Sequence, residues 1–274
     1  MGGGWIALIV LAALCVLLPF FLFAPRRAGN KKKAPFAGRN FAHRGLYEKD
    51  GSIAENSLTA FARAAAAGYG IELDVQFSRD GQIVVFHDDT LTRVCGKEAR
   101  VDEVDYAELR GLCLGETKDT VPLFADVLET VGGRVPIIVE LKNGRRNKEL
   151  CRRTLAMLRA YSGAYCVESF NPFIVAWFRF HAPEVLRGQL AQPPSLYKKE
   201  GFSAATGRLL GNVFFNFAAR PHFIAYRIGE KPRTVRFAER LGAMRVAWTA
   251  RAPGAGAGAD AVIFEHYRPE TQLK

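Results

Sequence analysis

Two acidic residues, Glu72 and Asp74, lie two positions apart in residues 70–76, an apolar segment that is typical of a buried strand. Side chains on a strand alternate between its two faces, so both carboxylates point to the same side. Two neighbouring carboxylates removed from water repel each other and lose hydration, which is costly unless a cation compensates. Ca²⁺ and Mg²⁺ prefer such oxygen ligands, so the pair indicates a divalent metal site.

The same pattern recurs in residues 136–142, where Glu140 and Lys142 share one face of a second predicted strand. Both lie at its carboxyl end, which is where barrel enzymes place their sites. Glu140 is therefore a third candidate metal ligand. The alternative is a set of internal salt bridges, for example between Lys142 and Glu72.

Two histidines lie at the ends of predicted strands near this acidic cluster. His43 ends the first strand, and His87 follows the apolar residues 83–86. A histidine pair is suited to general acid–base catalysis near neutral pH. Arg44 offers a fork of donors to a phosphate oxygen. The remaining histidines do not lie at the end of a predicted strand beside a carboxylate cluster and are interpreted as structural or surface residues: His181, His222 and His266.

Short apolar segments alternate with amphipathic ones from residue 41 onward. The predicted strands are residues 41–43, 70–76, 136–141, 165–169, 186–190, 223–226, 245–249 and 261–264. Amphipathic helices are expected at residues 57–67, 148–161, 172–180 and 233–241, the first capped by Asn56 or Ser57. This alternation favours a parallel α/β fold, and eight strands favour a (β/α)8 barrel, although the pattern alone leaves a doubly wound sheet open. Residues 88–122 interrupt the alternation and are expected to form an insertion over the active face.

The motifs together resemble the glycerophosphodiester phosphodiesterase family, in its membrane-anchored bacterial type. The resemblance rests on the runs Phe41-Ala-His-Arg-Gly45, Glu55-Asn-Ser57, Ile71-Glu-Leu-Asp-Val75 and Val84-Val-Phe-His-Asp88, and more loosely on residues 139–142, 247–249 and 258–263. It covers nearly all of the chain after residue 40. It implies a TIM barrel of the phospholipase C-like phosphodiesterase type with a small insertion.

The resemblance also implies roles for individual residues. Glu72, Asp74 and Glu140 would be metal ligands, and His43 and His87 the acid–base pair. Contacts to phosphate or substrate would come from Arg44, Lys142, Trp248 and Glu55. The chain departs from the family at Ala54, where proline is usual, and in the glycine-rich residues 251–259, where a barrel helix is usual. We therefore expect that corner of the barrel to be poorly covered and mobile.

These observations predict metal-dependent hydrolysis of glycerophosphodiesters to glycerol 3-phosphate and an alcohol. Two alternatives remain: a lysophospholipase-D-like hydrolysis of lysophospholipids at the membrane, and a catalytically silent membrane-tethered binding protein. The intact set of histidines, carboxylates and lysine argues against the silent protein. No protein partner can be inferred.

Residues 5–23 form an uncharged apolar run of 19 residues, which matches a hydrocarbon core of about 30 Å. Positive charges follow the run rather than precede it, which favours an uncleaved anchor over a signal peptide. We therefore expect a single-pass protein of the cell membrane with its catalytic domain in the cytoplasm. The predicted organisation is an anchor (residues 1–24), a basic linker (25–40) and a catalytic barrel (41–274).

The net charge of +11 is concentrated beside this anchor, because residues 1–40 carry six Lys or Arg and no acid. The remaining charge is spread thinly, and no basic groove with interleaved aromatic residues is visible, which argues against nucleic acid as a partner. The five cysteines are odd in number and lack metal-ligand spacing, so neither a disulfide framework nor a zinc site is expected.

Overall fold

The computed structural model describes residues 2–273, and eight of the nine strands in this part of the chain form a closed parallel barrel. The barrel closes because the first strand pairs with both the second and the last. In barrel order the strands are β1 (Arg39–His43), β2 (Gly70–Phe77), β4 (Ile137–Leu141), β5 (Tyr165–Ser169), β6 (Arg187–Ala191), β7 (Phe223–Arg227), β8 (Met244–Ala250) and β9 (Ala261–Phe264). The predicted (β/α)8 barrel is confirmed, each strand lying within two residues of its expected bounds.

The strands are buried on both faces, but the two faces differ. Outward side chains such as Leu73 pack against the surrounding helices, together with Phe61 and Phe124. The lower interior of the barrel is filled by bulky apolar side chains, among them Phe41 and Phe223. Glycines on neighbouring strands make room for these rings: a Cβ atom on Gly188 would lie 1.9 Å from the ring of Phe223.

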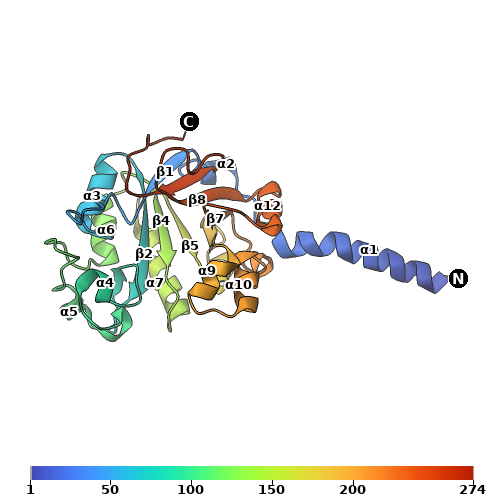
Figure 1. Cartoon of the computed structure of the whole chain (residues 1–274), viewed down its shortest axis with the longest axis horizontal. Coiled ribbons are helices and arrows are strands. Elements are labelled where there is room, and N and C mark those ends of the chain that lie inside the picture. The colour runs from blue at the N-terminus through green and yellow to red at the C-terminus, as the bar shows by residue number, and fades with distance from the viewer. Residues whose placement is uncertain (1, 274) are drawn as a thin grey trace.

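Helices surround the barrel in most of its βα units (Figure 1). They are α3 (Leu58–Ala66), α6 (Phe124–Val131), α7 (Asn147–Ala160), α8 (Pro172–His181), α9 (Pro194–Lys199), α10 (Ala204–Gly211), α11 (Asn216–Ala219) and α12 (Arg233–Arg240). Ser57 caps α3 by accepting a hydrogen bond from the backbone nitrogen of Ala60. Between β8 and β9 the chain forms turns and no helix, as expected from its glycine content.

The interruption after β2 has its own architecture. Strand β3 (Ile83–Val85) pairs antiparallel with β2 outside the barrel. It is followed by the short helices α4 (Thr92–Cys95), η1 (Val101–Glu103) and α5 (Tyr106–Leu109). Val84, Phe86 and Leu91 belong to a separate apolar cluster that holds this segment together.

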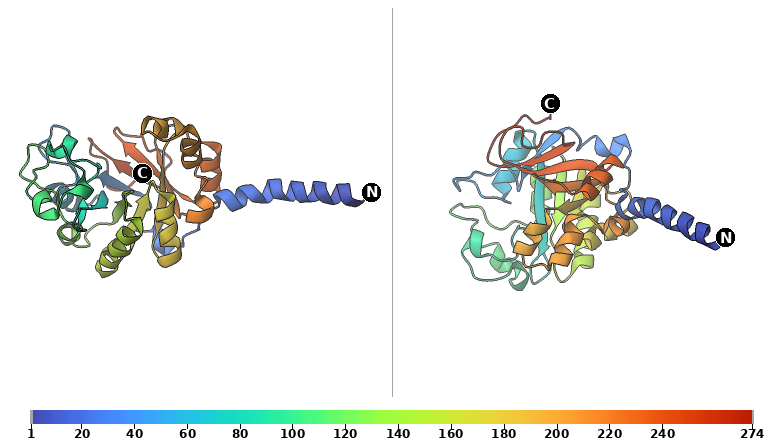
Figure 2. Two further views of the ribbon diagram at one scale, coloured as in Figure 1. Left: turned by 90° about the horizontal axis from the view of Figure 1, so that it is seen from below. Right: turned by 45° about the vertical axis from the view of Figure 1, so that its right-hand side comes forward.

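The N-terminal helix α1 (Gly2–Phe23) projects away from the barrel in all views (Figures 1 and 2). Its residues Trp5–Phe23 are apolar and long enough to cross a membrane, and only 6% of this window is buried. Signal sequences near an N-terminus share this length and composition. The short helix α2 (Asn30–Lys33) then leads the chain to β1.

Candidate active site

Three carboxylates meet at the carboxyl end of β2 and β4. Glu72 and Asp74 on β2, and Glu140 on β4, are all buried. One oxygen from each lies within 4.8 Å of an oxygen from the other two. Register pairs Asp74 with Glu140, so the two strands present these side chains at the same height. This arrangement of hard oxygen ligands suits a divalent cation such as Ca²⁺ or Mg²⁺.

Asp74 is the most strongly paired of the three. It accepts a hydrogen bond from Asn56 Nδ2 at 2.9 Å and lies 3.4 Å from Lys142 Nζ and 3.7 Å from Arg44 Nε. Although burial opposes ionisation, the charges of Lys142 and of nearby cations hold the pKa of Asp74 well below its ordinary value. Lys142 also pairs with Glu140 at 2.9 Å. An internal salt bridge of Lys142 was considered as the alternative to a metal site, with Glu72 as the example, but the partners of Lys142 are Asp74 and Glu140.

A fourth carboxylate, Glu168 on β5, faces the same cavity and was missed in the sequence analysis. Its Cα pairs in register with that of Glu140, and both of its side-chain oxygens are buried without a hydrogen-bond partner. Burial and the charge of Glu140 raise the pKa of Glu168, and burial with the charge of Asp74 raises that of Glu72.

Among the described residues, the permanent cations within ion-pair distance of these four carboxylates are Arg44 and Lys142. Burial, together with the charges of the neighbouring carboxylates, raises the pKa values of Glu72 and Glu168. The donor set therefore fits a divalent metal both by its oxygen chemistry and by its unbalanced charge.

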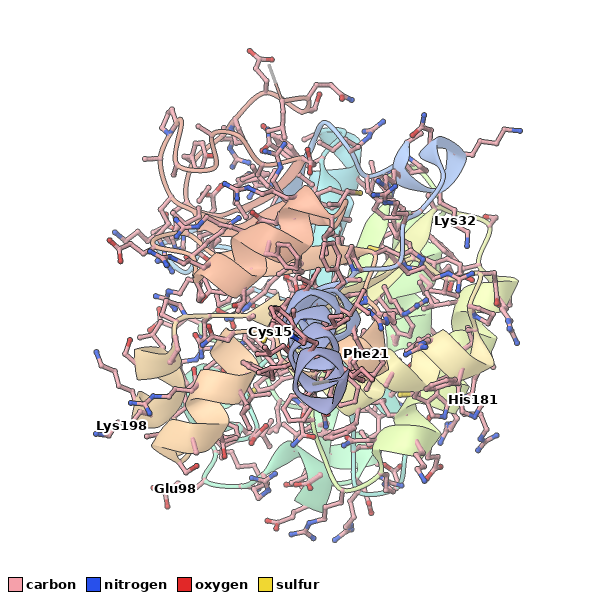
Figure 3. The ribbon with its side chains drawn as sticks, turned by 90° about the vertical axis from the view of Figure 1, so that its right-hand side faces the viewer. Cys15, Phe21, Lys32, Glu98, His181 and Lys198 are labelled. Carbon is pink, nitrogen blue, oxygen red and sulfur yellow. The ribbon has the colours of Figure 1, made fainter. Side chains whose placement is uncertain are left out.

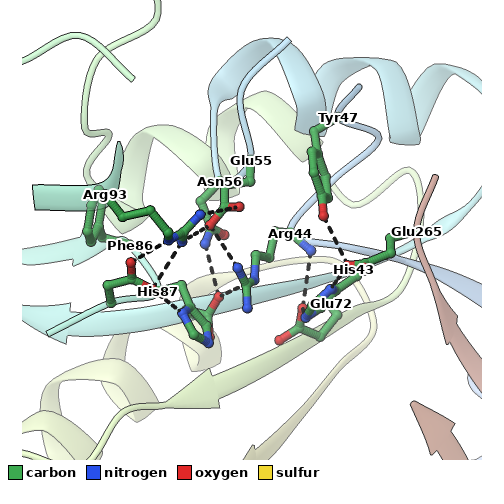
Figure 4. Close-up of polar contacts among 12 residues, drawn as sticks. His43, Arg44, Tyr47, Glu55, Asn56, Glu72, Phe86, His87, Arg93 and Glu265 are labelled. Carbon is green, nitrogen blue, oxygen red and sulfur yellow. Dashed lines mark hydrogen bonds and ion pairs between the residues drawn. The ribbon is translucent and has the colours of Figure 1, made fainter. Parts of the chain in front are cut away.

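His43 is oriented by a carboxylate beyond the strand end. Its Nδ1 lies 2.6 Å from Glu265 Oε2, which leaves Nε2 directed toward Glu72 at 3.9 Å (Figure 4). Glu265 also accepts hydrogen bonds from Tyr47 Oη at 3.0 Å and from Arg251 Nε at 2.5 Å. Burial lowers the pKa of His43, and the hydrogen bond to Glu265 opposes this effect.

His87 has a similar arrangement on the other side of the cluster. Its Nδ1 lies 2.6 Å from Asp88 Oδ1. Gln76 donates hydrogen bonds to the carbonyl oxygens of Phe86 and Asp88, at 2.8 and 2.9 Å, and so fixes the loop that carries the ring. Arg93 in turn pairs with Asp88 at 2.6 Å.

Arg44 is held by a strained turn at the end of β1. Its φ of 55° lies in the left-handed region, and its backbone nitrogen donates to Glu72 Oε2 at 3.2 Å. Its Nη1 donates to Glu55 at 2.8 Å. The next residue must be glycine, because a Cβ on Gly45 would lie 2.8 Å from the Cβ of Ala60.

The cavity above the carboxylates has a volume of about 540 Å³. One wall is aromatic: Phe170 and Trp248 meet edge to face, with ring centroids 5.7 Å apart. Trp248 donates a hydrogen bond to the carbonyl oxygen of Ala225 at 2.9 Å, which fixes the ring. A substrate in this cavity would contact apolar rings on one side and charged groups on the other.

The structure thus places most of the predicted site residues around one cavity. Those lining it directly are His43, Arg44, Glu72, His87, Glu140 and Trp248. Glu55 instead lies behind Arg44 and bridges it to Arg93 at 2.6 Å. The sequence holds a signal for both Glu168 and Glu265. Glu168 lies two positions after Cys166 on the predicted strand 165–169 and so shares its face, and Glu265 directly follows the predicted strand 261–264.

Comparison with known proteins yields one family match and several relatives. The model of the glycerophosphoryl diester phosphodiesterase family matches residues 43–268. A glycerophosphodiester phosphodiesterase of Bacillus altitudinis is 39% identical over 112 residues, which are 38% of this chain and 44% of that protein. The lysophospholipase D GDPD1 of Mus musculus is 31% identical over 150 residues, which are 50% of this chain and 46% of that protein.

Solved structures share the fold. A phosphodiesterase from Oleispira antarctica, solved with the product sn-glycerol-3-phosphate, has a TM-score of 0.68 at 22% identity. The match covers 84% of this chain and 94% of that one. A glycerophosphoryl diester phosphodiesterase from Silicibacter pomeroyi has a TM-score of 0.66 at 24% identity, over 84% and 90% of the two chains.

Proposed function

Because the chain belongs to the glycerophosphoryl diester phosphodiesterase family, we propose that it hydrolyses glycerophosphodiesters to glycerol 3-phosphate and an alcohol in a metal-dependent reaction. The observation that carries this proposal is the convergence of carboxylates, two histidines and Arg44 on one cavity, with Lys142 paired to Asp74 and Glu140. The chain spans less than half the length of the curated relatives it matches. The proposed activity therefore rests on the residues of the site and not on the relatives' names.

Glu72, Asp74 and Glu140 would hold the divalent cation, Ca²⁺ or Mg²⁺. When bound, such an ion stabilises negative charge that develops on a phosphate oxygen. Arg44 and Lys142 would contact the remaining phosphate oxygens. Lys142 is kept charged because the Glu140 and Asp74 carboxylates raise its pKa despite burial.

His43 and His87 would move the protons. Each ring has a carboxylate on Nδ1, which leaves Nε2 available to the cavity. One histidine takes a proton from the nucleophile, either water or the glycerol hydroxyl of the substrate, and the other gives a proton to the leaving alcohol. Trp248 would form a wall for the substrate, and Glu55 would fix the position of Arg44.

The test is release of glycerol 3-phosphate from several glycerophosphodiesters by the full chain, with and without a chelator. Activity should require added Ca²⁺ or Mg²⁺. His43→Ala and His87→Ala should each abolish turnover and retain metal binding. Full activity in either variant would refute its assigned role, and no activity on any diester would favour the silent binding protein.

A second candidate is lysophospholipase-D-like hydrolysis of lysophospholipids. It is favoured by α1, which would keep the cavity near a bilayer, and by the partial match to a lysophospholipase D. Deacylated diesters and lysophospholipids should be assayed side by side with the same preparation. A higher kcat/KM for the lysolipid would select this candidate.

The proposed location is the cell membrane, with α1 as a single span and the barrel in the cytoplasm. The basic residues that follow α1 support this orientation through the positive-inside rule. Protease accessibility of the barrel in sealed cells and in inverted vesicles would test it.

A further inference from the structure

The base of α1 is fixed to the barrel by packing and hydrogen bonds. Phe23 is buried in an apolar cluster with Ile224 and Tyr226, and its ring meets that of Phe214 edge to face at 5.2 Å. Arg220 Nη1 donates to the carbonyl oxygen of Ala24 at 2.8 Å. These contacts hold the base of α1 against one face of the barrel, so the same residues of that face lie beside the helix.

This face carries an apolar collar, which we define as Phe173 and Phe180 on α8, Phe202 before α10, Leu209 on α10 and Phe217 on α11. These five are all the exposed large apolar side chains that lie outside α1 in residues 2–273. Phe173 and Phe180 are 64% and 67% exposed. Scattered apolar residues need no explanation, but a cluster around one helix does.

Ring contacts join two members of the collar, Phe217 and Phe173, to α1. Phe21 on α1 stacks on Phe217 at 5.9 Å, Phe217 lies 6.5 Å from Phe215, and Phe215 lies 5.6 Å from Phe173 on α8. Figure 3 looks down α1 onto this face, with Phe21 near its centre and Lys32, His181 and Lys198 toward its rim. The aromatic surface therefore spreads sideways from the point where α1 leaves the barrel.

The two segments that build the collar are basic, although the exposed residues Glu184, Glu200 and Glu230 lie next to them in the sequence. The two segments that build the collar, residues 170–183 and 201–229, contain no Asp or Glu. Arg179 lies over the ring of Phe180 at 4.9 Å, and Arg220 over that of Phe21 at 5.5 Å. Aromatic rings with arginine heads beside them suit the boundary between acyl chains and anionic headgroups.

We propose that the collar is a second membrane contact, which seats the barrel on an anionic lipid bilayer around α1. This rests on the proposed membrane location of α1, but it goes beyond the proposed reaction and does not depend on the substrate. It gives the cavity a fixed orientation, because Gln192 and Glu200, which line the cavity, directly precede the segment that carries Phe202 and Leu209.

The test uses the full chain in nanodiscs of phosphatidylcholine with phosphatidylglycerol. Photoreactive benzoylphenylalanine replaces Phe173 or Phe180. Both positions are exposed, so the larger side chain does not disturb the packing of the barrel. The matched control position is Ala107, exposed on α5, which lies on the opposite side of the barrel from α1 in Figure 1. After irradiation, lipid adducts are measured by mass spectrometry.

We expect lipid adducts at positions 173 and 180, none above background at 107, and a higher yield with phosphatidylglycerol than in phosphatidylcholine alone. Adducts to a second copy of the chain in place of lipid would overturn the proposal, as would equal yields at all three positions or failure of the protein to co-purify with the discs. Hydrolysis of a soluble diester by the same variants is a separate readout, so failure of the collar and failure of the proposed activity are distinguishable.

Discussion

Replacing Glu265 by glutamine would show how far His43 depends on the carboxylate behind it. Glutamine keeps the size of the side chain and can still accept a hydrogen bond from Nδ1, but it removes the negative charge at 2.6 Å. A hydrogen bond to a charged group contributes about 1.5–3 kcal/mol, roughly twice a neutral one. If most of this difference, about 0.75–1.5 kcal/mol, is expressed in the transition state, kcat should fall about three- to tenfold, since about 1.4 kcal/mol is a factor of ten.

The measurement is steady-state release of glycerol 3-phosphate, with kcat and KM determined separately. Glu265→Gln should lower kcat and leave KM and metal affinity nearly unchanged, because Glu265 lies behind the ring and away from the Glu72–Asp74–Glu140 cluster. Tyr47→Phe is the matched control: it removes one hydroxyl donor to Glu265 but leaves the charge and the bond to His43. A wild-type kcat in Glu265→Gln, or an equal loss in Tyr47→Phe, would refute the reasoning.

Three further predictions concern stability. His222 is buried with a pKa lowered by burial to about 3, so the stability that its neutral form provides is present above pH 6.5 and lost as pH falls toward 3; urea unfolding across this range should show a flatter pH dependence in His222→Gln. Glu168→Leu should raise the free energy of unfolding in chelator by about 1–3 kcal/mol, because it removes a buried carboxylate without partners, and a lower value would contradict this. Gly45→Ala should cost about 1–3 kcal/mol and lower the melting temperature, because φ is +83° and Ala60 leaves no room; an unchanged melting temperature would show that the turn relaxes.

Much of the barrel could be predicted because its signal is local. Period-two alternation in β2 and β4 gave both the strand bounds and the inward direction of Glu72, Asp74 and Glu140. The same rule would have placed Glu168 in the cavity, had it been applied to β5. Strand β3 was not among the predicted strands, since three apolar residues beside a turn do not reveal antiparallel pairing.

The networks behind the site could not be predicted, because they depend on loops that are far apart in the sequence. Asn56 was considered as a cap for α3, but Ser57 caps that helix and Asn56 donates to Asp74. Its φ of 54° turns the side chain away from the helix and toward the barrel. Glu55 pairs with Arg44 and Arg93, and its predicted contact with the substrate stays a prediction. Neither pairing has a sequence signal.

Along the axis of the barrel, the residues that stabilise the fold and those proposed to carry out the reaction occupy different layers. Its lower layers are filled by rings such as those of Phe41 and Phe223, for which Gly70 and Gly188 make room. The layer at the carboxyl ends of β2, β4 and β5 carries four buried carboxylates, and among the described residues the permanent cations paired with them are Arg44 and Lys142, which leaves an excess of negative charge. This imbalance is tolerated because the apolar layers below and the helices outside provide the folding free energy. Substitutions in the lower layers should therefore change stability, whereas those in the charged layer should change metal binding and turnover.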